Sequence, residues 1–213
     1  MIITYGYNEN KKISAHFNSV EFRDKCGTLH EYKVSAELVN KLEQLFSALK
    51  CSKIIVNSGF RCPVNDRAVG GNGKGQHTLG TAADVVCYNQ KGSVISAKIV
   101  TCAAQDLAFS GIANISTRYQ AVHLDVRTSG IYKGNEVYGT NTVTSDFYAY
   151  WGLSKSAVYG YTPTVYTVKK NDNLSRISQQ LLGNANRYSE IKSLNNLKSD
   201  TIYIGQKLSI PQK

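Results

Sequence analysis

The spacing of apolar residues along the chain predicts both helices and short strands. Leu38, Leu42, Leu45 and Leu49 follow one another at intervals of four, three and four residues, which places them on one face of a helix that begins after Ser35. A second helix is expected over residues 96–109. Short apolar runs typical of buried strands occur at residues 53–56, 82–86 and 119–126.

Between the first two strands, residues 64–81 contain five glycines and little periodicity. We expect a long functional loop there, since long loops without structure of their own usually carry function. The whole pattern predicts an α+β fold with a small, mainly antiparallel sheet.

A change of composition marks a boundary after this domain. Residues 131–163 are rich in tyrosine, serine, threonine, glycine and asparagine and include the single tryptophan. These aromatic residues are too many for a free linker, so we expect the first half of the segment to pack on the preceding domain. We predict a first domain at residues 1–150, a connector at 151–163 and a small second domain at 164–213.

The composition narrows the possible partners. The chain has 213 residues, a net charge of +10 and a pI near 9.3, so it should be drawn to polyanions. No helix-turn-helix, zinc-finger or RNP-type pattern is present, and we expect no nucleic-acid partner.

Cysteines and the N-terminal sequence bear on the compartment. Five cysteines without a CxxC pair predict free thiols that act as small apolar residues, as in a reducing compartment, and no disulfide framework or closed zinc knuckle. The N-terminus lacks the charged start and apolar run of a signal peptide, and no later segment is apolar enough to span a membrane. We therefore expect synthesis in the cytoplasm.

His77, Asp84 and His123 are the candidate metal ligands. Two imidazoles and a carboxylate form a three-ligand zinc set with an open fourth position, which is typical of catalytic zinc. Zinc in such a set polarises a carbonyl and activates water. The ordinary alternatives are a loop-capping aspartate and a buried core histidine. His16 and His30 are expected to be surface or loop residues.

The residues around this set carry a family resemblance. It rests on Ser58-Gly59-Phe60-Arg61, Asn65, Val69-Gly70-Gly71 and the run from Gln76 to Asp84. These residues resemble the signature of the zinc D-alanyl-D-alanine carboxypeptidase family, which includes phage L-alanyl-D-glutamate endopeptidases and vancomycin-resistance D,D-dipeptidases. The likeness covers residues 14–130 and implies Zn²⁺ bound by His77, Asp84 and His123. Gly75 departs from the family pattern, which often has serine there.

The tail resembles a LysM domain. The likeness begins at residues 166–177, continues through Tyr188 and Asn195, and closes at residues 202–211. It implies a strand-helix-helix-strand fold that binds glycans containing N-acetylglucosamine, such as peptidoglycan. Asn171 stands where glycine is usual and should tolerate a positive φ, and Asn173 should cap the first helix. The candidate glycan-binding residues are Asn171, Asp172, Asn173, Leu174, Asn195 and Ile202.

Two further residues are candidates for catalysis. Arg61 resembles the family arginine that binds a substrate carboxylate or polarises a carbonyl, with a structural Arg–Asp pair as the alternative. Related subfamilies place an acid or a histidine at the positions of Gln120 or Ala121. Asp125 shares a strand face with His123 and is the candidate general base, with a structural pair to Arg127 or Arg61 as the alternative.

Together the two resemblances imply a zinc peptidase that cuts stem or cross-bridge peptides of peptidoglycan while LysM binds the wall glycan. The chain looks like a phage or prophage endolysin that reaches the wall through a membrane hole. Anionic wall polymers are a further expected partner. A D-alanyl-D-alanine carboxypeptidase of wall maturation and an inactive wall-binding protein remain the alternatives.

Overall fold

The protein is described from a computed structural model, which divides into two compact units, Met1–Gly152 and Leu153–Lys213. The description covers residues 1–116, 118–135, 142–160, 164–195 and 197–211, without the side chains of residues 132–135, 142–143 and 193. None of the helices in these ranges combines the length and apolar character that a membrane crossing requires.

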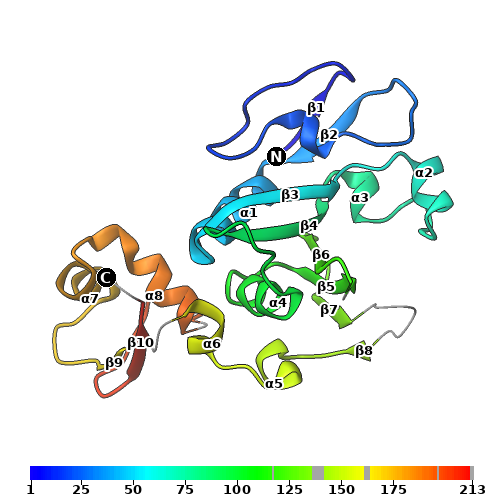
Figure 1. Cartoon of the computed structure of the whole chain (residues 1–213). Helices are drawn as coiled ribbons and strands as arrows, with labels where there is room; N and C mark the ends of the chain where they lie inside the picture. The colour runs from blue at the N-terminus through cyan, green and yellow to red at the C-terminus, as the bar shows by residue number, and fades with distance from the viewer. Residues whose placement is uncertain (117, 136–141, 161–163, 196, 212–213) are drawn as a thin grey trace. The chain divides into compact units, whose positions relative to one another are not determined.

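A six-stranded sheet organises the first unit (Figure 1). Its strand order is β3-β4-β6-β5-β7-β8, and only the β5–β7 pair is parallel among the described strands. The α+β fold with a mainly antiparallel sheet is therefore confirmed. The strands are β3 (Cys51–Ser58), β4 (Ala82–Asn89), β5 (Gly111–Ser116), β6 (Ala121–Asp125), β7 (Tyr132–Asn135) and β8 (Thr142–Val143).

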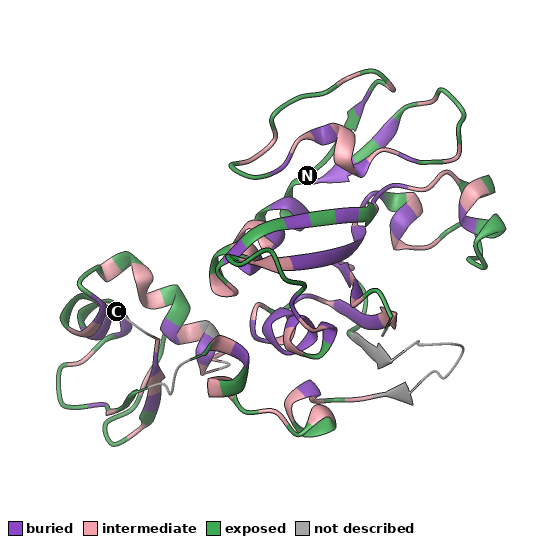
Figure 2. Ribbon diagram, in the orientation of Figure 1, coloured by how far each residue is buried: buried purple, intermediate pink, exposed green. Residues whose placement is uncertain are grey.

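Helices α1 (Ala36–Ala48) and α4 (Ala97–Asp106) pack against this sheet and against each other. The predicted apolar stripe of α1 is confirmed, since Leu38, Leu42 and Leu45 are fully buried. The side chain of Ser35 caps α1 by accepting the backbone N–H of Leu38. Strand β4 is buried along most of its length, as the purple ribbon in Figure 2 shows.

The glycine-rich segment is more ordered than the sequence predicts. Instead of one long loop, it forms two short helices, α2 (Pro63–Ala68) and α3 (Gln76–Leu79). The buried carboxylate of Asp66 fixes the turn between them by accepting the backbone N–H of Gly73 at 2.9 Å. Local periodicity could not reveal these helices because each is shorter than two helical turns.

A small N-terminal layer completes the first unit. Strands β1 (Ile2–Tyr5) and β2 (Tyr32–Ser35) form a separate antiparallel pair, and the short helix η1 (Ser19–Phe22) lies between them in sequence. Gly59 permits the backbone of Phe22 to approach the end of β3, since a Cβ there would lie 2.6 Å from the Phe22 Cα. Near the end of the unit, helix α5 (Phe147–Trp151) packs on α4.

The second unit has a core of its own. Strands β9 (Thr164–Thr167) and β10 (Lys207–Ile210) pair antiparallel, and α7 (Leu174–Leu182), η3 (Ala185–Arg187) and α8 (Tyr188–Leu194) lie between them in sequence. The strand-helix-helix-strand order is confirmed. So are the positive φ of Asn171, at 70°, and the cap on α7, where Asn173 accepts the N–H of Arg176 at 2.8 Å. The segment predicted as a connector includes a helix, α6 (Lys155–Tyr159), and its residues 161–163 lie outside the described ranges.

Gly80 ends α3 in the left-handed region with φ 73°, and a Cβ there would lie 2.6 Å from the carbonyl oxygen of Lys33. We expect Gly80→Ala to lower the free energy of unfolding by about 2 kcal/mol or more, because the positive φ and the clash add. Gly75→Ala is the matched control, since its φ is −75° and no atom lies within 4 Å of a built Cβ. Denaturant unfolding of both variants measures the difference, and equal midpoints would contradict the prediction.

Candidate metal centre

Asp84 and His123 face each other directly across two neighbouring strands. They are register partners in the antiparallel pair of β4 and β6, so their side chains leave the same face of the sheet. The neighbours Val122 and Leu124 point to the opposite face and are fully buried. Alternation of side chains along β6 thus gives the sheet one apolar face and one face that carries the candidate metal ligands.

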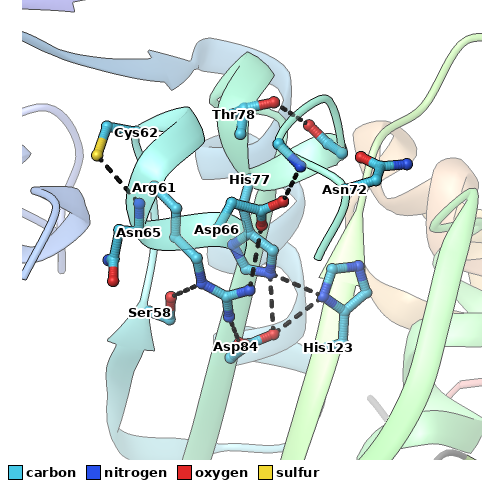
Figure 3. A network of polar contacts seen from close by, with 12 residues as sticks. Ser58, Arg61, Cys62, Asn65, Asp66, Asn72, His77, Thr78, Asp84 and His123 are labelled. Atoms are coloured by element: carbon cyan, nitrogen blue, oxygen red, sulfur yellow. Dashed lines mark hydrogen bonds and ion pairs between the residues drawn. The ribbon is translucent and has the colours of Figure 1, made fainter. Parts of the chain in front are cut away.

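His77 reaches this face from α3 (Figure 3). Its Nδ1 lies 2.6 Å from the carbonyl oxygen of Gly59, and because a carbonyl only accepts, Nδ1 carries the hydrogen. This leaves the Nε2 lone pair directed at His123 and Asp84. The main chain of the Ser58–Arg61 segment therefore sets the tautomer and orientation of His77.

Three donor atoms converge on one point. His77 Nε2 lies 3.1 Å from His123 Nδ1 and 3.2 Å from Asp84 Oδ1, and the last two atoms are 2.9 Å apart. Ligands on a tetrahedral zinc with bonds near 2.0–2.1 Å are separated by about 3.3 Å. The donor set and its size therefore fit zinc, with a fourth position left for water or substrate.

The electrostatics of the cluster favour one added positive charge. Burial acts to raise the pKa of Asp84, but hydrogen bonds with His123 and His77 outweigh it and hold that pKa well below its usual range. Burial also acts to lower the pKa of His123, yet Asp125 and Asp84 raise it to about 9. Without metal, a proton on His123 supplies this charge near neutral pH, and a divalent cation would replace it.

Arg61 stands behind Asp84. Its guanidinium pairs with Asp84 Oδ2, donates from Nε to Ser58 Oγ at 2.7 Å, and has Nη1 3.6 Å from Asp66 Oδ1. Each nitrogen of the guanidinium thus has a partner within the protein. This arrangement favours the structural Arg–Asp pair over the predicted binding of a substrate carboxylate.

Asp125 stands behind His123 in the same way. Its Oδ2 lies 3.1 Å from His123 Nε2, and both of its oxygens accept from Arg127. Burial opposes ionisation, but Arg127 and His123 hold the pKa of Asp125 well below its usual range. A fully buried carboxylate with these partners is a poor general base. The geometry speaks against the predicted base and for a residue that orients His123.

Gln120 and Ala121, which stand where related subfamilies carry an acid or a histidine, have structural roles in this chain. Gln120 has a positive φ of 53°, and its side-chain oxygen accepts the backbone N–H of Ala97 at 2.8 Å. It therefore caps the start of α4, whose N-cap residue makes no side-chain hydrogen bond. Ala121 is buried.

Of the six predicted glycan-binding residues, three support the fold of the second unit and three lie in one of its turns. Leu174 is 2% exposed and belongs to the core, so its side chain does not lie on the surface that the other predicted residues could offer to a glycan. Asn195 ties α8 to β10 through its two hydrogen bonds with the backbone of Ser209, and Ile202 packs against the core. Asn171 and Asn173 are exposed. Half-buried Asp172 accepts from the backbone N–H of Lys169 in the same turn and from the hydroxyl of Tyr166 on β9.

Two exposed apolar residues beside this turn were missed by the sequence analysis. Tyr203 and Ile204 are 71% and 72% exposed, and the following residue, Gly205, donates to the carbonyl oxygen of Val168. Their turn therefore lies next to the Lys169–Asn173 turn. The tyrosine in the Ile202–Gly205 run could have indicated this surface from the sequence, since exposed aromatic side chains often mark binding surfaces.

Comparison with known families agrees with these two units. The family described as peptidase M15 matches residues 15–125, a range that contains Arg61, Asp125 and the three donors. The LysM domain family matches residues 166–211. Both resemblances predicted from the sequence are confirmed.

Two curated relatives align with parts of the chain. The potassium binding protein Kbp of Escherichia coli O6:H1 (strain CFT073) is 48% identical over 62 residues, which are 28% of this chain and 42% of that protein. The cell wall-binding protein YocH of Bacillus subtilis (strain 168) is 30% identical over 119 residues, 49% of this chain and 40% of that protein. The chain thus matches about 40% of the length of these relatives.

Asp125→Asn separates the two roles considered for this residue. An orienting carboxylate predicts a fall in zinc affinity of about 10- to 100-fold, with activity restored by excess zinc. A general base predicts unchanged zinc affinity and a kcat lowered about 100- to 10,000-fold at saturating zinc. We expect the first result, measured by competition with a chelating dye and by kinetics at rising zinc. Asp200→Asn, which alters an exposed aspartate of the second unit, is the control.

Proposed function

This chain belongs to the peptidase M15 family, and on that premise we propose that it is a zinc-dependent peptidase that cuts peptides of bacterial peptidoglycan. The LysM unit holds it on the glycan of the same polymer. The observation that carries the proposal is the convergence of His77, Asp84 and His123 on one point. The match of residues 166–211 to the LysM domain family supports it.

The donor set defines what the residues do. When bound, zinc polarises the scissile carbonyl and activates water. The side chains of His77, Asp84 and His123 would hold the metal, each through one atom. Arg61 fixes the carboxylate of Asp84 from behind, and Asp125 fixes the imidazole of His123. Orienting partners of this kind keep the ligands in position during turnover.

The state of Arg61 favours an endopeptidase over a D-alanyl-D-alanine carboxypeptidase. A carboxypeptidase needs a cation for the terminal carboxylate of its substrate, and Arg61 was the predicted candidate. Its guanidinium already has a protein partner at each nitrogen, namely Asp84, Asp66 and Ser58. We therefore propose cleavage within stem or cross-bridge peptides, which breaks the wall as an endolysin does.

An inactive wall-binding protein is the second candidate. The observation that favours it is the side chain of Gln120, which caps α4 at the position where related subfamilies carry an acid. The relative YocH is named a cell wall-binding protein. Cleavage products distinguish the two candidates directly.

Purified peptidoglycan should release peptide fragments on incubation with the zinc-loaded protein, and mass spectrometry of the new termini identifies the bond. His77→Ala should lower the rate at least about 100-fold, because the metal loses a ligand. His16→Ala, an exposed histidine that pairs with Glu43, should cleave at the normal rate. Wall binding without any released peptide would establish the inactive candidate.

Tyr203→Ala should weaken binding to insoluble wall several-fold and leave cleavage of soluble peptides unchanged, because the side chain is exposed and lies outside the core of the second unit. Val165→Ala, which shortens another exposed apolar side chain of the same unit, is the control. Sedimentation with wall at several protein concentrations gives the affinity. Equal binding by both variants would contradict this assignment.

A further inference from the structure

A second group of metal-ligating side chains lies outside the set of His77, Asp84 and His123. Among the described residues, Asp24, Cys26, His30 and Cys62 each place one ligand atom within 4.8 Å of the others. The segment between η1 and β2 supplies three of them, and Cys62 comes from the start of α2. Asp24 is 3% exposed, and the other three residues are half-buried.

The imidazole of His30 indicates what the group binds. Its Nδ1 lies 2.8 Å from the carbonyl oxygen of Glu31, so Nδ1 carries the hydrogen. Its Nε2 lies 3.1 Å from Cys26 Sγ and 3.3 Å from Asp24 Oδ2. Two electron-rich atoms therefore meet the same ring nitrogen, an arrangement that either a proton on Nε2 or a metal cation bound by all three atoms satisfies.

Each of the two cysteines accepts a backbone N–H group. Cys26 Sγ accepts the backbone N–H of Thr28, and Cys62 Sγ accepts that of Asn65, both at 3.4 Å (Figure 3 shows the second contact). Both cysteines are free thiols in the structure. Hydrogen bonds from N–H groups favour the thiolate, which is the form that binds metal. Burial and the neighbouring Asp24 raise the pKa of Cys62, so a metal ion bound there would displace the thiol proton.

A catalytic Cys–His–Asp triad does not fit this geometry. A triad needs the thiol on one ring nitrogen and the carboxylate on the other, so that the carboxylate orients the base. Here Cys26 and Asp24 meet the same nitrogen of His30, and the other nitrogen faces a main-chain carbonyl. That carbonyl contact is the one usually made by a histidine that ligates a metal through its opposite nitrogen.

We propose that this group, which we call the sulfur site, is a structural zinc site. Its ligands are Cys26 Sγ, Cys62 Sγ, His30 Nε2 and Asp24 Oδ2. Two thiolates with an imidazole favour zinc, and four protein ligands close the coordination shell as in structural sites. The 3.3 Å separation of the His30 and Asp24 atoms equals the spacing of about 3.3 Å expected for nitrogen and oxygen on tetrahedral zinc.

The sulfur site lies where it can link the N-terminal layer to the segment that carries Arg61. Asp24 already accepts from the backbone of Cys62 at 2.6 Å and from the side chain of Asn65 at 2.5 Å. Zinc would add bonds from the same segment to Cys62, next to the arginine that holds Asp84. The sulfur site thus fastens the N-terminal layer to the edge of the candidate metal centre.

Metal content of the full-length protein, purified under reducing conditions with zinc, tests the proposal. We expect two zinc ions per chain by elemental analysis. His30→Ala and His77→Ala should each lose one ion, from different sites, whereas His16→Ala should keep both. One zinc in the starting protein that is lost with His77→Ala and kept with His30→Ala would overturn the proposal.

Cobalt substitution of the unmutated protein gives an answer that does not depend on how the variants fold. The candidate metal centre of His77, Asp84 and His123 contains no sulfur, so among the described metal-ligating groups thiolate-to-cobalt charge-transfer absorption can arise only from the sulfur site. We expect this absorption even if the candidate metal centre binds no metal. Its absence, or a Cys26–Cys62 disulfide found by thiol titration and peptide mapping in protein kept under reducing conditions, would refute the site.

Discussion

The cross-strand pair of Asp84 and His123 is the interaction on which the candidate metal centre depends. Burying a carboxylate is costly unless a positive charge accompanies it. Strands β4 and β6 place an imidazole directly opposite that carboxylate, and α3 adds a second one. A slip of one residue in this register would turn His123 toward the helices and Val122 toward the centre. The apolar packing that sets the register of the sheet therefore also determines which side chains face the candidate metal centre.

Each ligand on the sheet is backed by a charged partner. Asp84 forms an ion pair with Arg61. His123 pairs with Asp125, which in turn forms an ion pair with Arg127. Asp125 fits because Gly111 has no side chain: a Cβ there would lie 1.9 Å from Asp125 Oδ2. Such support immobilises the ligands before metal arrives, which lowers the entropic cost of binding it.

The two units divide the proposed work between chemistry and attachment. In the second unit, Leu174, Ile177 and Leu208 form part of a core that is independent of the first. Its turns leave Asn171, Tyr203 and Ile204 at the surface. The net charge of +10 is consistent with the proposed attachment, because attraction to a polymer that carries anionic groups would precede specific contacts.

By itself, the sequence determined the features that depend on neighbours along the chain. The leucine stripe of α1, the left-handed Asn171 and the Asn173 cap follow from local spacing and residue type, and the motif from Ser58 to Asp84 indicated the family. Only the tertiary structure decided between the roles that the sequence left open. It placed Asp125 behind His123 in a pair with Arg127, the side chain of Gln120 at the start of α4, and Leu174 in a core. It also brought Cys62 to Asp24, Cys26 and His30, which spacing could not predict because these contacts depend on how the segments pack.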